Sequence, residues 1–193
     1  MAQQEPVAAE RLAPAEQPVE AKPDFILDRA QKAFEREDFV LAEKQFAMVL
    51  RQQENQEQAL LGMGFIRANQ ARYEEALDFC NRVLVANDLL PEAYFLRGLI
   101  FEAQQEVVAA VEEYRKALLL DLDFIMPHYN LARIFQRLAQ PREASRELNN
   151  TMRLLEQTTD EVIIPHSGGL SRAVFLEICR QDFSLLDLDV VVE

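Results

Sequence analysis

The sequence is poor in the residues that build disulfide-rich or metal-binding folds. Its 193 residues include no tryptophan, five glycines, two histidines and two cysteines. Cys80 and Cys179 lie far apart in the chain and form neither a disulfide framework nor a metal-ligand pair. His128 and His166 have no Cys, Glu or second His at ligand spacing. We therefore expect a reducing, cytoplasmic environment and no metal site.

Long hydrophobic runs and an excess of positive charge are missing as well. Arg97 and Asp121 interrupt the longest apolar stretches, so none reaches the roughly 18 residues of a membrane span. The first 22 residues contain Glu5, Glu10 and Glu16 and no apolar block, unlike a secretory signal. Lys and Arg number 20 against 33 Asp and Glu, a net charge of -13, which disfavours nucleic acid and anionic membranes as partners. The composition predicts a soluble protein that does not insert into membranes.

The pattern of an enzyme active site is also missing from the sequence. The one Gly-x-Gly, Gly62-Met63-Gly64, falls inside a predicted helix rather than after a strand, so it is no phosphate-binding loop. Cys80 occupies a predicted core position, where packing is its expected role. No nucleophile, base and orienting group occur together. We expect a non-catalytic protein with no cofactor.

What the sequence does contain is an internal repeat. Residues 1–22, with Pro6, Pro14 and Pro18, predict a disordered tail or linker. From Pro23 four blocks of 34 residues follow without a gap: 23–56, 57–90, 91–124 and 125–158. Two columns hold only small residues. The eighth position reads Ala30, Gly64, Gly98 and Ala132, and the twentieth reads Ala42, Ala76, Ala110 and Ala144.

Each block reads as two helices separated by a polar break near position 15. In the third block the apolar runs are Pro91–Gln104 and Val107–Leu120. The small columns allow these helices to cross closely, and the apolar face that remains requires the pairs to stack as a solenoid. Residues 159–193 break the period. After Pro165 and a turn at 167–169 they predict a capping helix, then a loose or docking C-terminal tail, with one apolar face formed by Leu170, Ala173, Val174, Phe175 and Ile178.

This column pattern resembles the tetratricopeptide repeat, a 34-residue helix-turn-helix unit. The resemblance covers 23–158 and implies an all-α solenoid of about four repeats with a C-terminal capping helix. The sequence departs from the family pattern at three arginines. Arg29 and Arg97 stand where Leu is typical, and Arg67 stands where an aromatic residue is typical. The family's usual proline at position 32 is also missing from all four blocks.

The resemblance further implies a concave wall built by the first helix of each repeat. Its apolar and aromatic middle suits an amphipathic helix or an extended polypeptide, and arginines of the fourth repeat would fix an acidic group. The alternative is that the chain's own ends cover this wall. The carboxylate clamp of chaperone-binding members is not built, because its basic positions hold mostly Leu, Phe and acidic residues. The predicted groove residues are Leu27, Gln31, Leu61, Phe65, Phe95, Leu99, Tyr129, Asn130, Arg133 and Arg137.

A second resemblance covers residues 91–183. The segments Lys116–Phe124, Asn150–Leu155 and Gly169–Arg180 are similar to repeats appended to bacterial chemoreceptor glutamate methyltransferases. This similarity implies an accessory module that contacts a chemoreceptor, the methyltransferase or another signalling protein and transfers no methyl group itself. The competing interpretation is a tetratricopeptide-type secretion chaperone that holds an export substrate in its groove.

Overall fold

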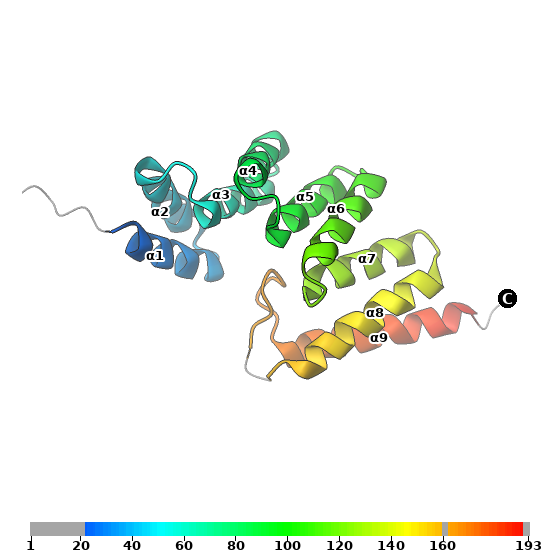
Figure 1. The fold of residues 1–193 in the computed structure, drawn as a ribbon. Coiled ribbons are helices and arrows are strands. Elements are labelled where there is room, and N and C mark those ends of the chain that lie inside the picture. Colours follow the sequence, from blue (N-terminus) through cyan, green and yellow to red (C-terminus); the bar gives the residue numbers. More distant parts are fainter. Residues whose placement is uncertain (1–21, 160–161, 191–193) are drawn as a thin grey trace, which may run out of the picture.

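The structure, a computed structural model, describes residues 22–159 and 162–190, without the side chains of 187–190. The tail predicted for 1–22 therefore lies outside the described residues except for Lys22, as do residues 191–193. The described part of the chain is all-α, as predicted, and Figure 1 shows its helix pairs stacked one after another. In chain order the helices are α1 (Pro23–Glu35), α2 (Phe39–Gln52), α3 (Glu57–Asn69), α4 (Tyr73–Ala86), α5 (Pro91–Ala103), α6 (Val107–Leu120), α7 (Ile125–Arg137), α8 (Pro141–Gln157) and α9 (Arg172–Val190).

The first helix of each repeat begins at the predicted block boundary. The first residue of each 34-residue block is also the first residue of α1, α3, α5 or α7. Pro23, Pro91 and Pro141 occupy first helical turns, where a missing N–H costs no hydrogen bond. Each helix packs on the next, and α3 also contacts α1 and α5. The first helices therefore form one continuous inner surface, called the concave wall below.

The polar break at position 15 is a left-handed turn in every repeat. Glu37, Ala71, Gln105 and Ala139 have φ of 60°, 57°, 65° and 52°. The next residue closes the same bond each time: the Asp38 N–H donates to the Ala33 carbonyl at 2.9 Å, and equivalent bonds of 2.8–2.9 Å recur in the other repeats. This is the Schellman ending of a helix, formed here without glycine. It reverses the chain so that the second helix packs back on the first.

The columns of small residues lie where the two helices of a repeat cross. The four alanines of the twentieth position have no exposed surface. At Gly98 an added Cβ would lie 2.5 Å from the Tyr114 ring of the same repeat. At Gly64 it would lie 3.4 Å from Phe79 Cβ of the same repeat and 2.8 Å from a methyl group of Leu96 in the next one. The predicted close crossing is therefore confirmed, and larger residues would push the helices apart.

The arginines that depart from the repeat pattern are matched by acidic residues of the second helices. Arg67 is 8% exposed and pairs with Glu43 at 2.8 Å. The hydrogen bond from Arg67 holds the pKa of Glu43 below its ordinary value. Arg97 Nε lies 3.4 Å from Glu113 Oε2, and Arg29 lies over the Phe25 ring. Charge pairing and ring contact therefore replace the hydrophobic contacts that a Leu or aromatic residue would make there.

The capping helix forms after the fourth repeat, but one detail of its prediction was wrong. The helix packs on α8 through Phe175, Leu176, Cys179 and Leu186, which are buried. Ala173 and Val174, expected on the packed face, are exposed because the true face is turned toward residues 175 and 176. The C-terminal segment, predicted as a loose or docking tail, is helical as far as Val190, and its buried Leu186 fits the docking alternative.

Candidate functional site

A row of aromatic rings crosses the concave wall. Phe65 on α3 lies 6.4 Å from Phe95 on α5, measured between ring centroids. Phe34 on α1 extends the row on one side, 6.0 Å from Phe65, and Phe124 extends it on the other, 5.0 Å from Phe95. Sequence reasoning missed these two outer rings. Phe34 occupies position 12 of its block, which is itself a wall position of the family, so the signal for it was present.

A hairpin between α8 and α9 reaches this row of rings. Residues 162–172, called the hairpin below, contain one antiparallel bridge between Ile163 and Ser171. The Ile164 N–H donates to the Leu170 carbonyl at 3.0 Å, and the Arg172 N–H donates to Val162 at 3.1 Å. Figure 1 shows the hairpin, in orange, leaving the α8–α9 end and rising toward the inner side of the earlier repeats.

The turn of the hairpin, residues 165–169, is called its tip below. The tip contacts the row of aromatic rings through His166. The imidazole stacks on Phe65 with a centroid distance of 4.8 Å and an interplanar angle of 17°. Its centroid lies 5.5 Å from Phe95 and 6.0 Å from Phe124. Burial of the ring lowers the pKa of His166 to about 4, although the residue as a whole keeps exposed surface. Among the described residues, the chain itself thus covers the middle of the wall through an internal hairpin.

The fourth repeat is covered by α9 in the same way. The Tyr129 ring meets Phe175 edge-on at 4.8 Å, and its hydroxyl donates to Asp182 at 3.2 Å. Burial, with the nearby Asp182 carboxylate, raises the pKa of Tyr129 to about 12. Arg133 stays exposed, with its guanidinium 5.9 Å from the centre of the Tyr129 ring. Both predicted arginines are exposed, and Arg137 differs from Arg133 in its ion pair with Glu102.

Three of the predicted groove residues belong to the interior or to ion pairs. Asn130 is buried and donates to the Tyr114 hydroxyl at 3.1 Å, and that hydroxyl donates to Glu102 at 2.9 Å. Glu102 also binds Arg137 at 2.8 Å, so this arginine holds α5 to α7 and already has an acidic partner. Phe95 has no exposed surface and is a core residue. The sequence placed them on the wall because repeat position alone does not show which neighbour a side chain meets.

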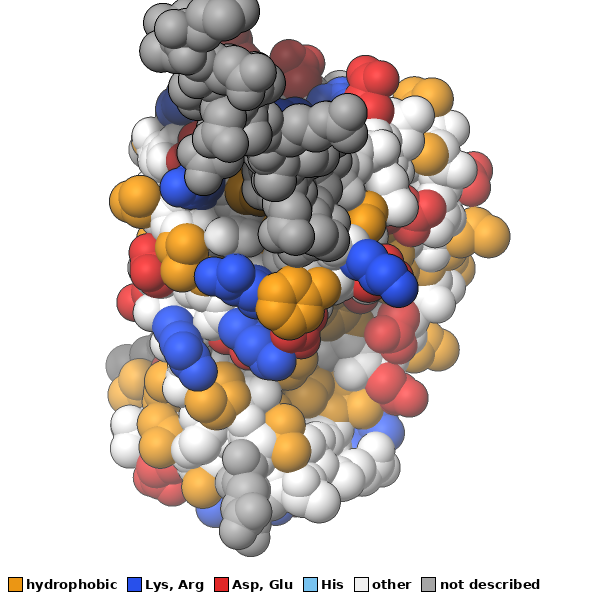
Figure 2. All heavy atoms as spheres, turned by 90° about the vertical axis from the view of Figure 1, so that its left-hand side faces the viewer, with side chains coloured by type: hydrophobic (Ala, Val, Ile, Leu, Met, Phe, Trp, Pro, Cys, Tyr) orange, Lys and Arg blue, Asp and Glu red, His pale blue; other side chains and the backbone are white. Residues whose placement is uncertain are grey.

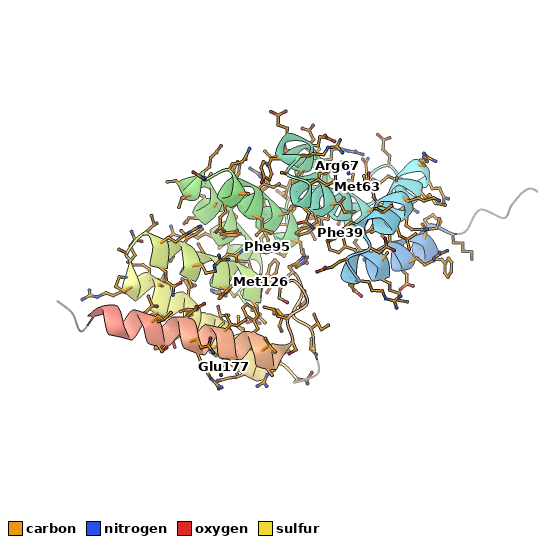
Figure 3. All side chains as sticks on the ribbon, turned by 180° about the vertical axis from the view of Figure 1, so that it is seen from behind. Phe39, Met63, Arg67, Phe95, Met126 and Glu177 are labelled. Carbon is orange, nitrogen blue, oxygen red and sulfur yellow. The ribbon has the colours of Figure 1, made fainter. Side chains whose placement is uncertain are left out.

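Among the described residues, a partly exposed part of the wall lies on α1 and α3; it is called the uncovered part below. Leu27 and Gln31 of α1 are half-buried, as are Phe34 and Phe65, and Gln31 donates to Gln58 at 3.2 Å. Figure 2, which faces this end of the molecule, shows hydrophobic side chains within a hollow between its upper and lower parts. In Figure 3 Phe95 is labelled near the hairpin and Glu177 beside α9. The remaining predicted residues, Leu61 and Leu99, are buried and half-buried.

The described residues offer no grouping suited to catalysis or metal binding. No cluster of three or more His, Cys, Asp or Glu occurs among them. Burial raises the pKa of Cys80 and of Cys179 to about 12, which is opposite to what a reactive thiolate requires. Across the described helices, none is long and apolar enough to cross a membrane.

Comparison with known proteins supports the fold and leaves the family open. No family model matches the sequence. A curated human protein, Protein O-mannosyl-transferase TMTC3, is 35% identical over 91 residues, which are 47% of this chain. The chain spans only 10% of the length of that protein.

Two solved structures are similar to nearly the whole repeat region. MamA from Desulfovibrio magneticus aligns with a TM-score of 0.58 at 23% identity, over 71% of this chain and 77% of that one. The type III secretion translocator chaperone SycD from Yersinia enterocolitica aligns with a TM-score of 0.58 at 13% identity, over 76% and 88%. Together with the helix pairs and small-residue columns, these likenesses establish the all-α, tetratricopeptide-like solenoid.

Proposed function

We propose that this protein is a non-catalytic interaction scaffold that binds a polypeptide on the uncovered part of its concave wall. The observation that carries the proposal is the half-buried apolar surface of Leu27, Phe34 and Phe65 on adjoining first helices. Such a surface accepts bulky side chains of an amphipathic helix or an extended segment. The partner is therefore a protein or peptide, and the binding needs no cofactor or nucleic acid.

We further propose that the partner belongs to a bacterial chemoreceptor methylation system in the cytoplasm. The support is the sequence resemblance of residues 91–183 to repeats appended to chemoreceptor methyltransferases. Phe124 ends the first similar segment, and its ring lies 6.0 Å from His166, three residues before the last similar segment begins. The client in this case is a folded chemoreceptor, methyltransferase or other signalling protein.

The second candidate function is that of a secretion chaperone, and the likeness to SycD favours it. That likeness extends over 76% of this chain, so it includes more than a single repeat. The two candidates differ in the client. A chaperone holds an unfolded export segment that aggregates alone, whereas a signalling module binds a protein that is already folded.

The test is capture of clients from native lysate with the wild type and a wall variant, Leu27→Asp. The matched control is Val85→Asp, because Val85 is 89% exposed on α4, away from the wall. Each captured client is then titrated calorimetrically against all three proteins. We expect Leu27→Asp to weaken binding about tenfold or more and Val85→Asp to leave it unchanged.

The identity of the client separates the two candidates, and its affinity tests the site. Chemosensory proteins support the first candidate, and an export substrate supports the second. Equal affinity of Leu27→Asp and wild type, with unchanged helicity, contradicts the wall as the binding site. Phe95→Ala is a poor variant for this purpose, because Phe95 is fully buried and truncating it costs about 3–5 kcal/mol of stability.

A further inference from the structure

We propose that the hairpin is a displaceable plug of the concave wall, whose His166 ring occupies the place of a ligand's aromatic anchor on Phe65. The inference rests on the proposed function and concerns the regulation of the same surface. When the hairpin is docked, a ligand reaches only the α1 side of the ring row. When its tip leaves, the row is open from Phe34 to Phe124.

The contact between tip and wall is narrow. His166 contacts the rings of Phe65, Phe95 and Phe124. Gly168 and Gly169, which follow it in the turn, have open space around them. A Cβ added at Gly168 or Gly169 would meet nothing within 4 Å. His166 thus makes the aromatic contacts of the tip, and the two glycines beside it are not packed into the wall.

The docked His166 is also only partly buried. One face of its ring contacts the aromatic row, yet the residue as a whole is exposed. Its φ of 63° is a left-handed conformation that costs free energy for any residue with a Cβ. A polar, partly exposed ring on a strained backbone is easier to replace than a buried apolar ring on a relaxed one.

The base of the hairpin is fixed independently of the tip. Ile164 is 2% exposed and belongs to the core shared by α5 to α9. Arg172 Nε donates to the Leu155 carbonyl at 2.7 Å, which ties the other strand to α8. Ser167 Oγ accepts the Leu170 N–H at 2.9 Å and keeps the turn closed on itself. The tip therefore has its own hydrogen bonds and a fixed base, so it can leave the wall without unfolding α9.

The test compares His166→Gly with His166→Phe, two variants of one position with opposite expected effects. Glycine fits the left-handed backbone and removes the ring, whereas phenylalanine keeps a ring and replaces the polar imidazole with an apolar one. The first readout is the fluorescence of 8-anilinonaphthalene-1-sulfonate, a probe of exposed apolar surface. We expect at least threefold more signal with His166→Gly than with His166→Phe, at equal far-UV circular dichroism. Equal signals would overturn the plug.

The second readout is binding of a free peptide that copies residues 162–171. If the tip competes for the wall, this peptide binds His166→Gly at least tenfold more tightly than His166→Phe. Equal binding, or none to either variant, counts against the plug. These outcomes do not depend on the natural client. If a client binds while the His166 proton resonances keep their ring-current shift, the plug is refuted and the proposed function stands. If Leu27→Asp binds the client as tightly as the wild type does, the proposed function alone is refuted.

Discussion

The two halves of the solenoid share one repeat pattern and differ in what covers their concave side. In the second half, one core runs from α5 to α9 and includes Phe95, Ile164 and Phe175. In the first half, two smaller cores serve α1 to α5, and the wall residues Leu27 and Phe34 stay half-buried. The repeat therefore builds the scaffold, and the non-repeating residues after α8 decide which part of its wall stays available.

The largest expected effect comes from weakening the packing of α9 against the second half of the solenoid. Phe175 has no exposed surface and supports Tyr129 edge-on, so Phe175→Ala leaves a cavity between α9 and the fourth repeat. We expect a loss of about 3–5 kcal/mol in the free energy of unfolding. Urea titration followed by circular dichroism measures it, and hydrogen exchange should show protection lost in α8 and α9 while α1 and α2 keep theirs.

The matched variant of the first half is Phe46→Ala, at a site 2% exposed in the core of α1 to α3. A similar loss is expected, now with exchange confined to α1 to α3. If both variants unfold the same segments together, the halves form one cooperative unit and the comparison between them fails.

A smaller effect separates two glycines of the same column. Gly98→Ala would place a methyl group 2.5 Å from the Tyr114 ring, which is held by hydrogen bonds to Glu102 and Asn130. Gly64→Ala meets a terminal methyl group of Leu96, which is buried but, unlike the Tyr114 ring, is not held by hydrogen bonds. We expect Gly98→Ala to cost about 2 kcal/mol and Gly64→Ala less than about 1 kcal/mol, since alanine also favours the helix. Thermal unfolding compares the two, and equal losses would show that Tyr114 yields as easily as Leu96.

The helix pairs of the solenoid could be predicted from the sequence because the same packing contacts recur in each repeat. The alanine and glycine columns predicted where helices cross, and the helix starts followed from the 34-residue period. The left-handed turn at position 15 was predicted only as a polar break, because none of its four residues is the glycine that normally marks such a turn. The pairing of Arg67 with Glu43 was also not predicted, since it joins neighbouring repeats across 24 positions.

The covered part of the site could not be predicted from the repeat. The stacking of His166 on Phe65 joins a unique loop to a residue two repeats away, and no column or spacing relates them. Phe95 and Asn130 occupy the same helix positions as residues that line the wall elsewhere. What buries them is the neighbouring Tyr114, Phe124 and hairpin, and these contacts depend on tertiary packing alone.

A fall in pH should weaken the docking of the hairpin on the concave wall before it unfolds the repeats. The pKa of His166 is about 4 when the ring is docked and near 6.5 when it is free, and burial against Phe65, Phe95 and Phe124 is the cause. The undocked tip thus binds the proton more readily. Docking is at full strength above about pH 6.5 and weakens as the pH falls toward 4.

The measurement is the fluorescence of the apolar probe between pH 7.5 and pH 5. The wild type should gain signal several-fold, whereas His166→Phe should stay flat, because its tip no longer carries an imidazole that can take up a proton. The ion pair of Glu43 remains intact in the same interval, since Arg67 holds the pKa of Glu43 below its ordinary value of 4.5. A wild-type signal that does not change with pH would contradict the docked, neutral His166.

The smallest effect should be the same in both halves. Ala71 and Ala139 hold φ of 57° and 52° at equivalent turns, one in the second repeat and one in the fourth. Glycine adopts this conformation without the clash of a Cβ, but it also loses more entropy on folding. We expect Ala71→Gly and Ala139→Gly each to raise the free energy of unfolding by about 0.5–1 kcal/mol, measured by urea titration. Because both turns close the same hydrogen bonds and neither touches the hairpin or α9, a gain in one repeat only would mean that the cover also strains the turns beneath it.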